Sequence, residues 1–192
     1  MGTTFVGEDK SAIVVFDILS SELMKSTFSD DCEVIIISPW VKDYPIPSTW
    51  PNFSSNFYAI KDMQRISDIL EKLSHKHKVR VTLCTKSEKR LKDEKWGEWN
   101  IRAAIEFHER IKKYGVTICW ENRNEQHAKC VVTSENVFIT SANATPTGIG
   151  GNQGNAGSLH SKRDNKEFYE EQRQWCLDWL KKSENPDDYF SK

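Results

Sequence analysis

The sequence predicts an α/β fold in which one sheet carries helices on its faces. Short runs of β-branched and apolar residues, such as Val34 to Ile37 and Val79 to Cys84, are typical of buried strands. Longer runs with apolar side chains every three or four residues, such as Trp99 to Tyr114, are typical of amphipathic helices. The two kinds of run alternate along the chain, which predicts a sheet with helices packed against it.

Helices are expected at residues 11–25, 58–73, 99–114 and 168–180. Ser11 stands at the start of the first apolar run, in a position that suits a helix start. Gly115 follows the third run and fits the usual role of glycine after the end of a helix. In the last helix, Trp175 and Trp179 are expected to face the core.

Strands are expected at residues 34–37, 79–84 and 116–120, followed by a hairpin that turns at Ser134 and Glu135. Residues 39–51 contain four of the six prolines, so the segment 39–57 is expected to be a loop that helps to cover a site. The Gly/Asn-rich segment 147–158 is expected to be a connection near the mouth of that site. Its glycines do not match the spacing of a dinucleotide cradle, so no cofactor is expected.

The length of 192 residues fits one domain that spans 1–192. The net charge of −1 does not mark the chain as a nucleic-acid binder. Lysine and arginine are nevertheless concentrated between Lys61 and Lys113, where they could hold a polyanion or form a solvated helix face. His108 lies on an apolar helix face and is expected to be a core histidine with its hydrogen bonds satisfied.

The five cysteines form no metal-binding or disulfide pattern. Cys84, Cys119 and Cys130 lie in apolar runs and are expected to be free core thiols, which favours a reducing compartment. No signal peptide and no apolar stretch near 18 residues are visible, so the protein is expected to be soluble and cytoplasmic, with no membrane contact.

Four polar residues of the predicted hairpin carry the functional signal. His127 and Lys129 are expected on one face of its first strand, and Ser141 and Asn143 on one face of its second strand. If the hairpin turns at 134–135, the four side chains converge near its open end. An imidazole, an ammonium, a hydroxyl and an amide form a set that suits phosphate chemistry.

These residues resemble the signature of the phospholipase D superfamily, written H-x-K-x4-D-x6-G-S-x-N. His127 and Lys129 match its first half, and Ser141 and Asn143 match its second half. The resemblance implies a mixed sheet flanked by helices on both faces. The chain departs from the pattern at Ser134, which replaces Asp, and at Thr140, which replaces Gly, and the spacing is one residue shorter. His160-Ser161-Lys162 is a second H-x-K triplet with no match downstream, and it is interpreted as a solvated loop or strand end.

The resemblance implies a phosphodiesterase that needs two signature histidines. One forms a phosphohistidine and the other is the general acid and then the general base. This chain has one signature, so the implied enzyme is a homodimer whose two hairpins share one site. Lys129 and Asn143 are expected to bind the phosphate with Ser141 and to stabilise the charge that develops during the reaction. No carboxylate cluster surrounds the motif, which favours a mechanism without metal ions.

In the relatives, a glutamate that follows the second half of the signature orients the histidine. The corresponding residues of this chain, 152–157, contain no carboxylate. Asn155, Glu121 or Glu125 could take this role, and the sequence leaves the three open. Without an orienting acceptor, an imidazole spends part of its time in the wrong tautomer and loses rate.

Three functions are compatible with these observations. The first is a metal-independent nuclease acting on DNA or RNA. The second is a weak or inactive member that binds nucleic acid within a larger defence or restriction complex, which the missing Asp and Glu favour. The third is a phospholipase, which the absence of an amphipathic membrane-binding helix disfavours. The tryptophans considered for base stacking are Trp40, Trp50, Trp96 and Trp99, each with burial as the expected fate.

Overall fold

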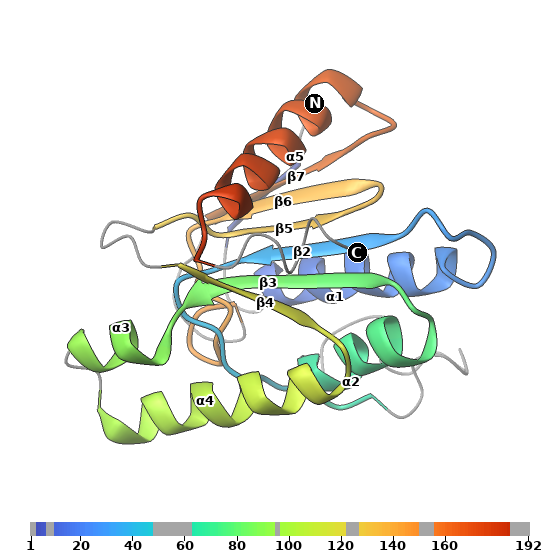
Figure 1. Ribbon diagram of the computed structural model, residues 1–192. Helices are drawn as coiled ribbons and strands as arrows, with labels where there is room; N and C mark the ends of the chain where they lie inside the picture. The colour runs from blue at the N-terminus through green and yellow to red at the C-terminus, as the bar shows by residue number, and fades with distance from the viewer. Residues whose placement is uncertain are drawn as a thin grey trace.

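A computed structural model of the chain describes residues 3–6, 10–47, 63–94, 97–121, 127–149 and 156–184. A seven-stranded mixed sheet forms its centre, with the strand order β1-β7-β6-β5-β2-β3-β4 (Figure 1). The strands are β1 (Thr3–Val6), β2 (Glu33–Ile37), β3 (Arg80–Lys86), β4 (Thr117–Glu121), β5 (Cys130–Thr133), β6 (Asn136–Thr140) and β7 (Ala156–Ser161). Strands β2, β3 and β4 are parallel, and the pairs β2-β5, β5-β6, β6-β7 and β7-β1 are antiparallel.

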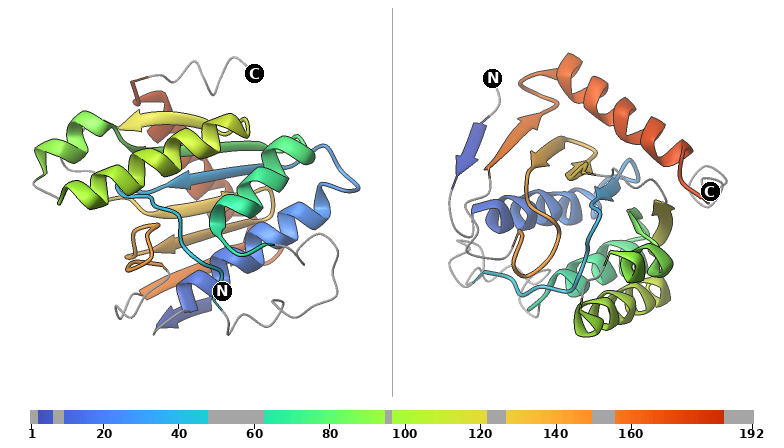
Figure 2. Two further views of the ribbon diagram at one scale, coloured as in Figure 1. Left: turned by 90° about the horizontal axis from the view of Figure 1, so that it is seen from below. Right: turned by 90° about the vertical axis from the view of Figure 1, so that its left-hand side faces the viewer.

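Helices cover both faces of this sheet, as expected. They are α1 (Lys10–Lys25), α2 (Ile66–Glu71), α3 (Glu88–Asp93), α4 (Glu98–Lys113) and α5 (Lys166–Lys181), and a π-helical turn, η1 (Lys72–Lys76), extends α2. Helices α1, α2 and α4 lie on one face, and α5 lies on the other (Figure 2). Alternation along β2 explains the two layers, because Val34 and Ile36 pack toward the first group while Ile35 and Ile37 pack toward α5.

The layer beneath α5 contains the three cysteines that were expected in the core. Cys84, Cys119 and Cys130 are buried there as free thiols, which confirms that expectation. A fourth thiol, Cys176 of α5, lies 3.2 Å from the sulfur of Cys130. Trp175, one residue earlier on α5, is 41% exposed, so the expectation that it faces the core is wrong.

The helix expected at 58–73 is only partly correct. Residues 48–62 lie outside the described ranges, and the described helix begins at Ile66. Met63 to Arg65 are not helical because their backbone pairs with the segment after β2: Ile46 N–H donates to Gln64 O, and Ile66 N–H donates to Tyr44 O. The carboxylate of Asp68 then accepts the N–H groups of Gln64 and Arg65, which fixes the helix start.

Strands β1 and β7 and helix α3 were not expected. Residues 156–158, assigned to the glycine-rich loop, form the start of β7 between β6 and β1. Gly157 fits there because the ring of Phe138 passes close to it, and a Cβ at this position would lie 2.5 Å from that ring. Gly115 has a φ of +88° after α4, which confirms its role in ending that helix.

Candidate active site

All four signature residues lie at one edge of the sheet, called here the site edge. The carboxyl ends of β2, β3 and β4 meet the start of β5 and the end of β6 at this edge. His127 and Lys129 directly precede β5, and Ser141 and Asn143 directly follow β6. The expectation that the four residues lie on the strands themselves is therefore wrong. The right-hand view of Figure 2 looks onto the site edge.

The hairpin register joins the two halves of the signature. Cys130 pairs with Ile139, and the next backbone bond runs from Thr140 N–H to Lys129 O at 3.0 Å. The strands turn at Ser134 and Glu135, as expected, so the open end of the hairpin carries both halves. The pairing of β5 with β6 stops at this point, and the four polar residues lie in irregular backbone beyond the two strands.

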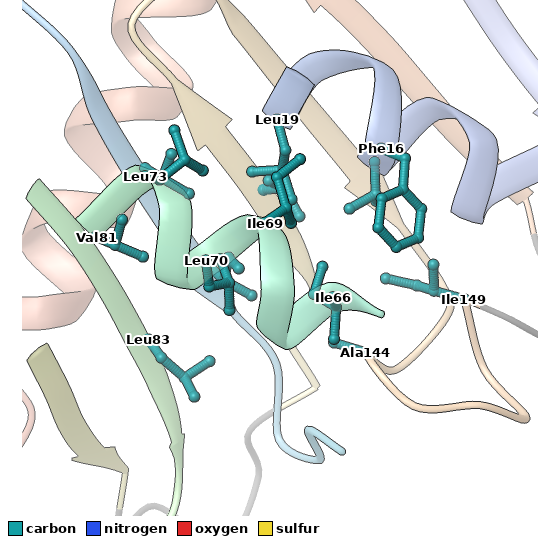
Figure 3. Close-up of a cluster of buried hydrophobic side chains, with 14 of the residues drawn as sticks. Phe16, Leu19, Ile66, Ile69, Leu70, Leu73, Val81, Leu83, Ala144 and Ile149 are labelled. Carbon is teal, nitrogen blue, oxygen red and sulfur yellow. The ribbon is translucent and has the colours of Figure 1, made fainter. Parts of the chain in front are cut away.

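The loop after β6 is fixed by its own backbone and by the core. Asn143 O accepts N–H groups from Thr145 and Ile149, both at 2.8 Å. Ala144 and Ile149 are buried, and Figure 3 shows them in the cluster that includes Phe16 of α1. Asn143 therefore stands on a loop whose neighbouring residues are anchored in the core. Its side-chain Oδ1 is buried, and no partner for it occurs among the described residues.

Residues after β2 hold the same loop from the other side. Ser38 Oγ donates to Trp40 O at 2.7 Å and accepts from Ala144 N–H at 3.0 Å. Lys42 N–H donates to Ala144 O at 2.9 Å. Sequence reasoning did not single out Ser38 or Lys42, although a serine directly after a buried strand was a visible signal.

Ser141 makes contacts that differ from the expected phosphate contact. Its hydroxyl donates to Ala156 O at 3.3 Å and accepts from Ala156 N–H at 3.1 Å. The Ser141 side chain therefore holds the first residue of β7 against the end of β6. A contact to phosphate would have to share this hydroxyl with the backbone of β7.

Two lysines lie close to one another at the site edge. Lys129 Nζ donates to His127 O at 2.7 Å, and the exposed imidazole of His127 belongs to the same short segment. Burial, followed by the positive charge of Lys86, lowers the pKa of the Lys129 ammonium from its usual value. Lys86 is itself buried at the end of β3 and forms an ion pair with Glu94. An anion bound near Lys129 would relieve the repulsion between the two ammonium groups. The sequence showed Lys86 only as one of the basic residues between Lys61 and Lys113, and the folded sheet brings it near the hairpin.

Of the three residues considered as orienters of His127, the structure describes only Glu121. Asn155 and Glu125 lie outside the described residues. Glu121 is fully buried at the end of β4, opposite Lys86 of β3. Strands β2 and β3 separate β4 from β5, so Glu121 lies roughly 14 Å from the start of β5 at the usual strand spacing. The sheet therefore does not bring Glu121 to the hairpin.

The position that replaces the signature Asp lies at the opposite end of the sheet. Ser134 Oγ donates to Glu22 Oε2 at 2.9 Å and accepts from Lys25 Nζ at 2.8 Å. Lys25 also pairs with Glu135 at 2.8 Å. Both Ser134 and Glu22 are buried, and burial raises the pKa of the Glu22 carboxyl. In this chain, α1 supplies a carboxylate that fixes the hairpin turn, far from the site edge.

A pocket of about 250 Å³ adjoins the signature on the side of α5. Its lining includes His127, Lys129, Thr140, Gln172 and Trp175.

His160, the histidine of the second H-x-K triplet, lies on β7 with its ring 4.2 Å from that of Phe168. Ser161 ends β7, so the interpretation of this triplet as a strand end is confirmed. His160 is half-buried and its Nδ1 is buried, so it is less solvated than expected.

The two described tryptophans among those considered for base stacking differ in exposure. Trp40 is buried, and Trp50 and Trp96 lie outside the described residues. Trp99 is 75% exposed at the start of α4, so the expectation that it is buried is wrong.

Within the described ranges, no group of three or more potential metal ligands occurs. No described helix has the length and apolar character needed to cross a membrane.

Comparison with known proteins places this geometry in context. The family model described as "Cardiolipin synthase, PLD-like domain" matches residues 53–175, which is more than half of the chain. No curated protein sequence gives a significant match.

Solved structures give matches at low sequence identity. NucT from Helicobacter pylori has a TM-score of 0.56 and 12% identity, over 95% of this chain and 97% of that chain. The polyphosphate kinase from Porphyromonas gingivalis has a TM-score of 0.56 and 11% identity, over 91% of this chain. The present chain spans only 25% of the kinase. At these identities the likeness concerns the fold alone.

Proposed function

Because the chain belongs to the phospholipase D superfamily through its PLD-like domain, we propose that it is a metal-independent phosphodiesterase that cuts DNA or RNA. The observation that carries the proposal is the bond from Thr140 N–H to Lys129 O, which joins the two halves of the signature at the site edge. We further propose that residues 1–192 act as one domain. In support, the N-terminal strand β1 pairs with β7 inside the same sheet.

The proposed reaction begins with attack of the neutral His127 imidazole on phosphorus. A nitrogen–phosphorus bond forms, the bond to the leaving oxygen breaks, and a second histidine gives that oxygen its proton. Water then attacks the phosphohistidine and gives a proton to the second histidine, so that His127 leaves with the electron pair of the broken bond. Each histidine is thereby returned to its starting protonation state.

Charge stabilisation is assigned to Lys129 and Asn143. Donors that already point toward the phosphate stabilise the transition state because they need no reorganisation during the reaction. The proximity of Lys86 supports this role, since an anion beside the two ammonium groups lowers the electrostatic energy of the site. This arrangement supplies the charge that metal ions supply in two-metal nucleases, so we propose that cleavage proceeds in the presence of a chelator.

The second histidine is assigned to a second copy of the chain. One signature supplies one His127, and the two steps above need two imidazoles. A twofold axis beside the exposed His127 would place both in one site. We propose Asn155 or Glu125 as the orienting acceptor, and the separation of β4 from β5 by two strands supports this choice over Glu121.

The first test is cleavage of labelled DNA, RNA and phospholipid by the purified protein in excess EDTA. We expect nucleic acid to be cut by the wild type and by His160→Ala, and not by His127→Ala. His160→Ala is the matched control because it removes the histidine of the other H-x-K triplet. An acid-labile phosphate adduct on His127 should be trapped by quenching without acid. Cleavage of phospholipid alone, or strict dependence on Mg²⁺, would contradict the proposal.

The second test concerns the two donors. Lys129→Ala and Asn143→Ala should each raise the activation free energy by about 2–4 kcal/mol, as removal of other oxyanion donors does. The loss should appear mainly in kcat, because the contact strengthens in the transition state. Circular dichroism checks that both variants fold. Wild-type kcat in both variants would remove Lys129 and Asn143 from the mechanism.

A binding subunit of a larger defence or restriction complex is the second candidate. The departures from the signature favour it: Ser134 replaces the family's Asp, and residues 152–157 contain no carboxylate to orient the histidine. An imidazole without an orienting acceptor is a poor catalyst. This candidate predicts salt-dependent binding of nucleic acid with no cleavage under any of the conditions above.

A further inference from the structure

Trp99 and Lys42 form an unusual pair beside the site edge. Trp99 is the second residue of α4, and its side chain is 75% exposed. The ammonium of Lys42 lies 5.3 Å from the centroid of the indole ring. Lys42 Nζ also donates to Asn100 Oδ1 at 2.5 Å, which fixes the cation against the ring. The pair therefore presents an open aromatic surface beside a fixed positive charge.

The pair, called here the Trp99 platform, is connected directly to the candidate site. The backbone N–H of Lys42 donates to Ala144 O, and Ala144 follows Asn143 in the chain. One lysine side chain thus spans the distance between the loop that carries Asn143 and the indole ring. The right-hand view of Figure 2 shows the segment after β2 running between this loop and the start of α4.

Positive charge continues past the platform. A groove of about 350 Å³ is lined by Lys42, Trp99 and Arg110, among other residues. Asp43 pairs with both Arg65 and Arg110. The groove is lined by three cations, Lys42, Arg65 and Arg110, and by two carboxylates, Asp43 and Glu106, so these residues carry a net positive charge. Lys129 lies beside His127 at the site edge, so a cation is present near each end of the path from His127 to Trp99. Such a path suits a sugar–phosphate backbone.

We propose that the Trp99 platform stacks a base of single-stranded nucleic acid while a neighbouring phosphate lies at His127. This inference rests on the proposed function and names its substrate class. Bases of a duplex are already stacked on each other, so only an unpaired base can lie flat on the indole. The surroundings argue against a protein partner at this position, because the exposed neighbours Glu98 and Arg102 are charged.

Binding is tested by fluorescence anisotropy with labelled oligonucleotides in the His127→Ala background, which prevents cleavage. The probes are a single strand, the same strand with abasic sites, and the duplex. Trp99→Ala should weaken binding of the intact single strand by about 5- to 150-fold, the range reported for loss of one base–aromatic stack. Binding of the abasic strand should not change. Trp99→Phe should restore part of the loss.

Phe28→Ala is the matched control. Phe28 is 92% exposed after the end of α1, and α1 contacts the hairpin turn at the opposite end of the sheet through Lys25. This substitution removes an equally accessible aromatic ring far from the site edge, so binding of all three probes should stay at the wild-type level.

The outcomes separate this inference from the proposed function. Equal losses for intact and abasic strands in Trp99→Ala, or no loss, would overturn the platform even if the wild type cuts nucleic acid. A change of sedimentation coefficient in Trp99→Ala would overturn it in favour of an interface between copies. Base-dependent binding through Trp99 without any cleavage by the wild type would support the platform and contradict the proposed catalysis.

Discussion

The His108 imidazole is buried on the inner face of α4, as expected, with its ring 5.4 Å from that of Trp120. The expectation of satisfied hydrogen bonds is wrong for its Nε2, which is buried without a partner among the described residues. Burial, and then the charge of Lys112, lowers the pKa of His108 from 6.5 to about 4. The side chain is therefore neutral at neutral pH.

This pKa predicts a loss of stability in mild acid. Because the folded-state pKa lies below the unfolded value, protons bind the unfolded chain more tightly between about pH 6.5 and pH 4. The free energy of unfolding should fall by roughly 3 kcal/mol across this window from His108 alone. His108→Leu should remove that part of the pH dependence, measured by urea unfolding at several pH values. His75→Leu, at an exposed position, is the control, and an unchanged slope in His108→Leu would contradict the prediction.

At the residue scale, the sequence predicts the chemistry of the signature better than its surroundings. His127, Lys129 and Asn143 are identifiable because their types and spacing match a pattern. Lys86 is not identifiable as a site residue because it reaches the site edge only through strand pairing far away in sequence. No local signal distinguishes Lys86 from the many lysines around it.

Among the elements, the loop after β6 has a packing constraint that can be tested. A Cβ added at Gly148 would lie 2.1 Å from the backbone oxygen of Asn143 and 3.0 Å from each of its backbone C and N atoms. Gly148→Ala should therefore displace Asn143 and lower kcat on the order of 10²-fold, as small misplacements of a reacting group do. Gly97→Ala is the matched control, because nothing lies within 4 Å of its added Cβ. Equal kcat values for both variants would show that Asn143 needs no fixed position.

The hairpin turn gives a second prediction at this scale. Ser134→Asp would restore the family residue, but it would remove a donor to Glu22 and place a second carboxylate beside it. We expect a loss of roughly 1–3 kcal/mol in the free energy of unfolding. Ser134→Asn keeps a donor without the charge and should be less costly. Urea unfolding measures both, and a more stable Ser134→Asp variant would mean that Lys25 compensates fully.

Elements with strong apolar periodicity were predictable, and those without it were not. Helices α1, α4 and α5 and strands β2, β3 and β4 follow from their side-chain patterns. Strand β7 contains one large apolar residue, Leu159, and forms because β6 and β1 offer backbone partners on both sides. Its glycine and serine residues resemble a loop until that pairing is known.

For the whole molecule, the central prediction is that two chains share one site. Sedimentation at concentrations where the protein cuts should show a dimer. When His127→Ala chains are mixed and equilibrated with wild-type chains, activity should fall as the square of the wild-type fraction, because a mixed dimer lacks one histidine. Addition of His160→Ala chains should cause no such fall. An active monomer, or a linear fall, would require the second histidine to come from elsewhere.

The hold of Ser38 and Lys42 on the carbonyl and amide of Ala144 has a consequence for protein engineering. The signature occupies a contiguous stretch of 127–143, which suggests that it could be moved between scaffolds as one piece. Its second half nevertheless depends on two hydrogen bonds from the segment after β2, more than 100 residues earlier. A graft of the hairpin alone would carry the histidine and the lysine but leave Asn143 without its support. A transplanted site would therefore have to include residues 38–42 of the donor as well.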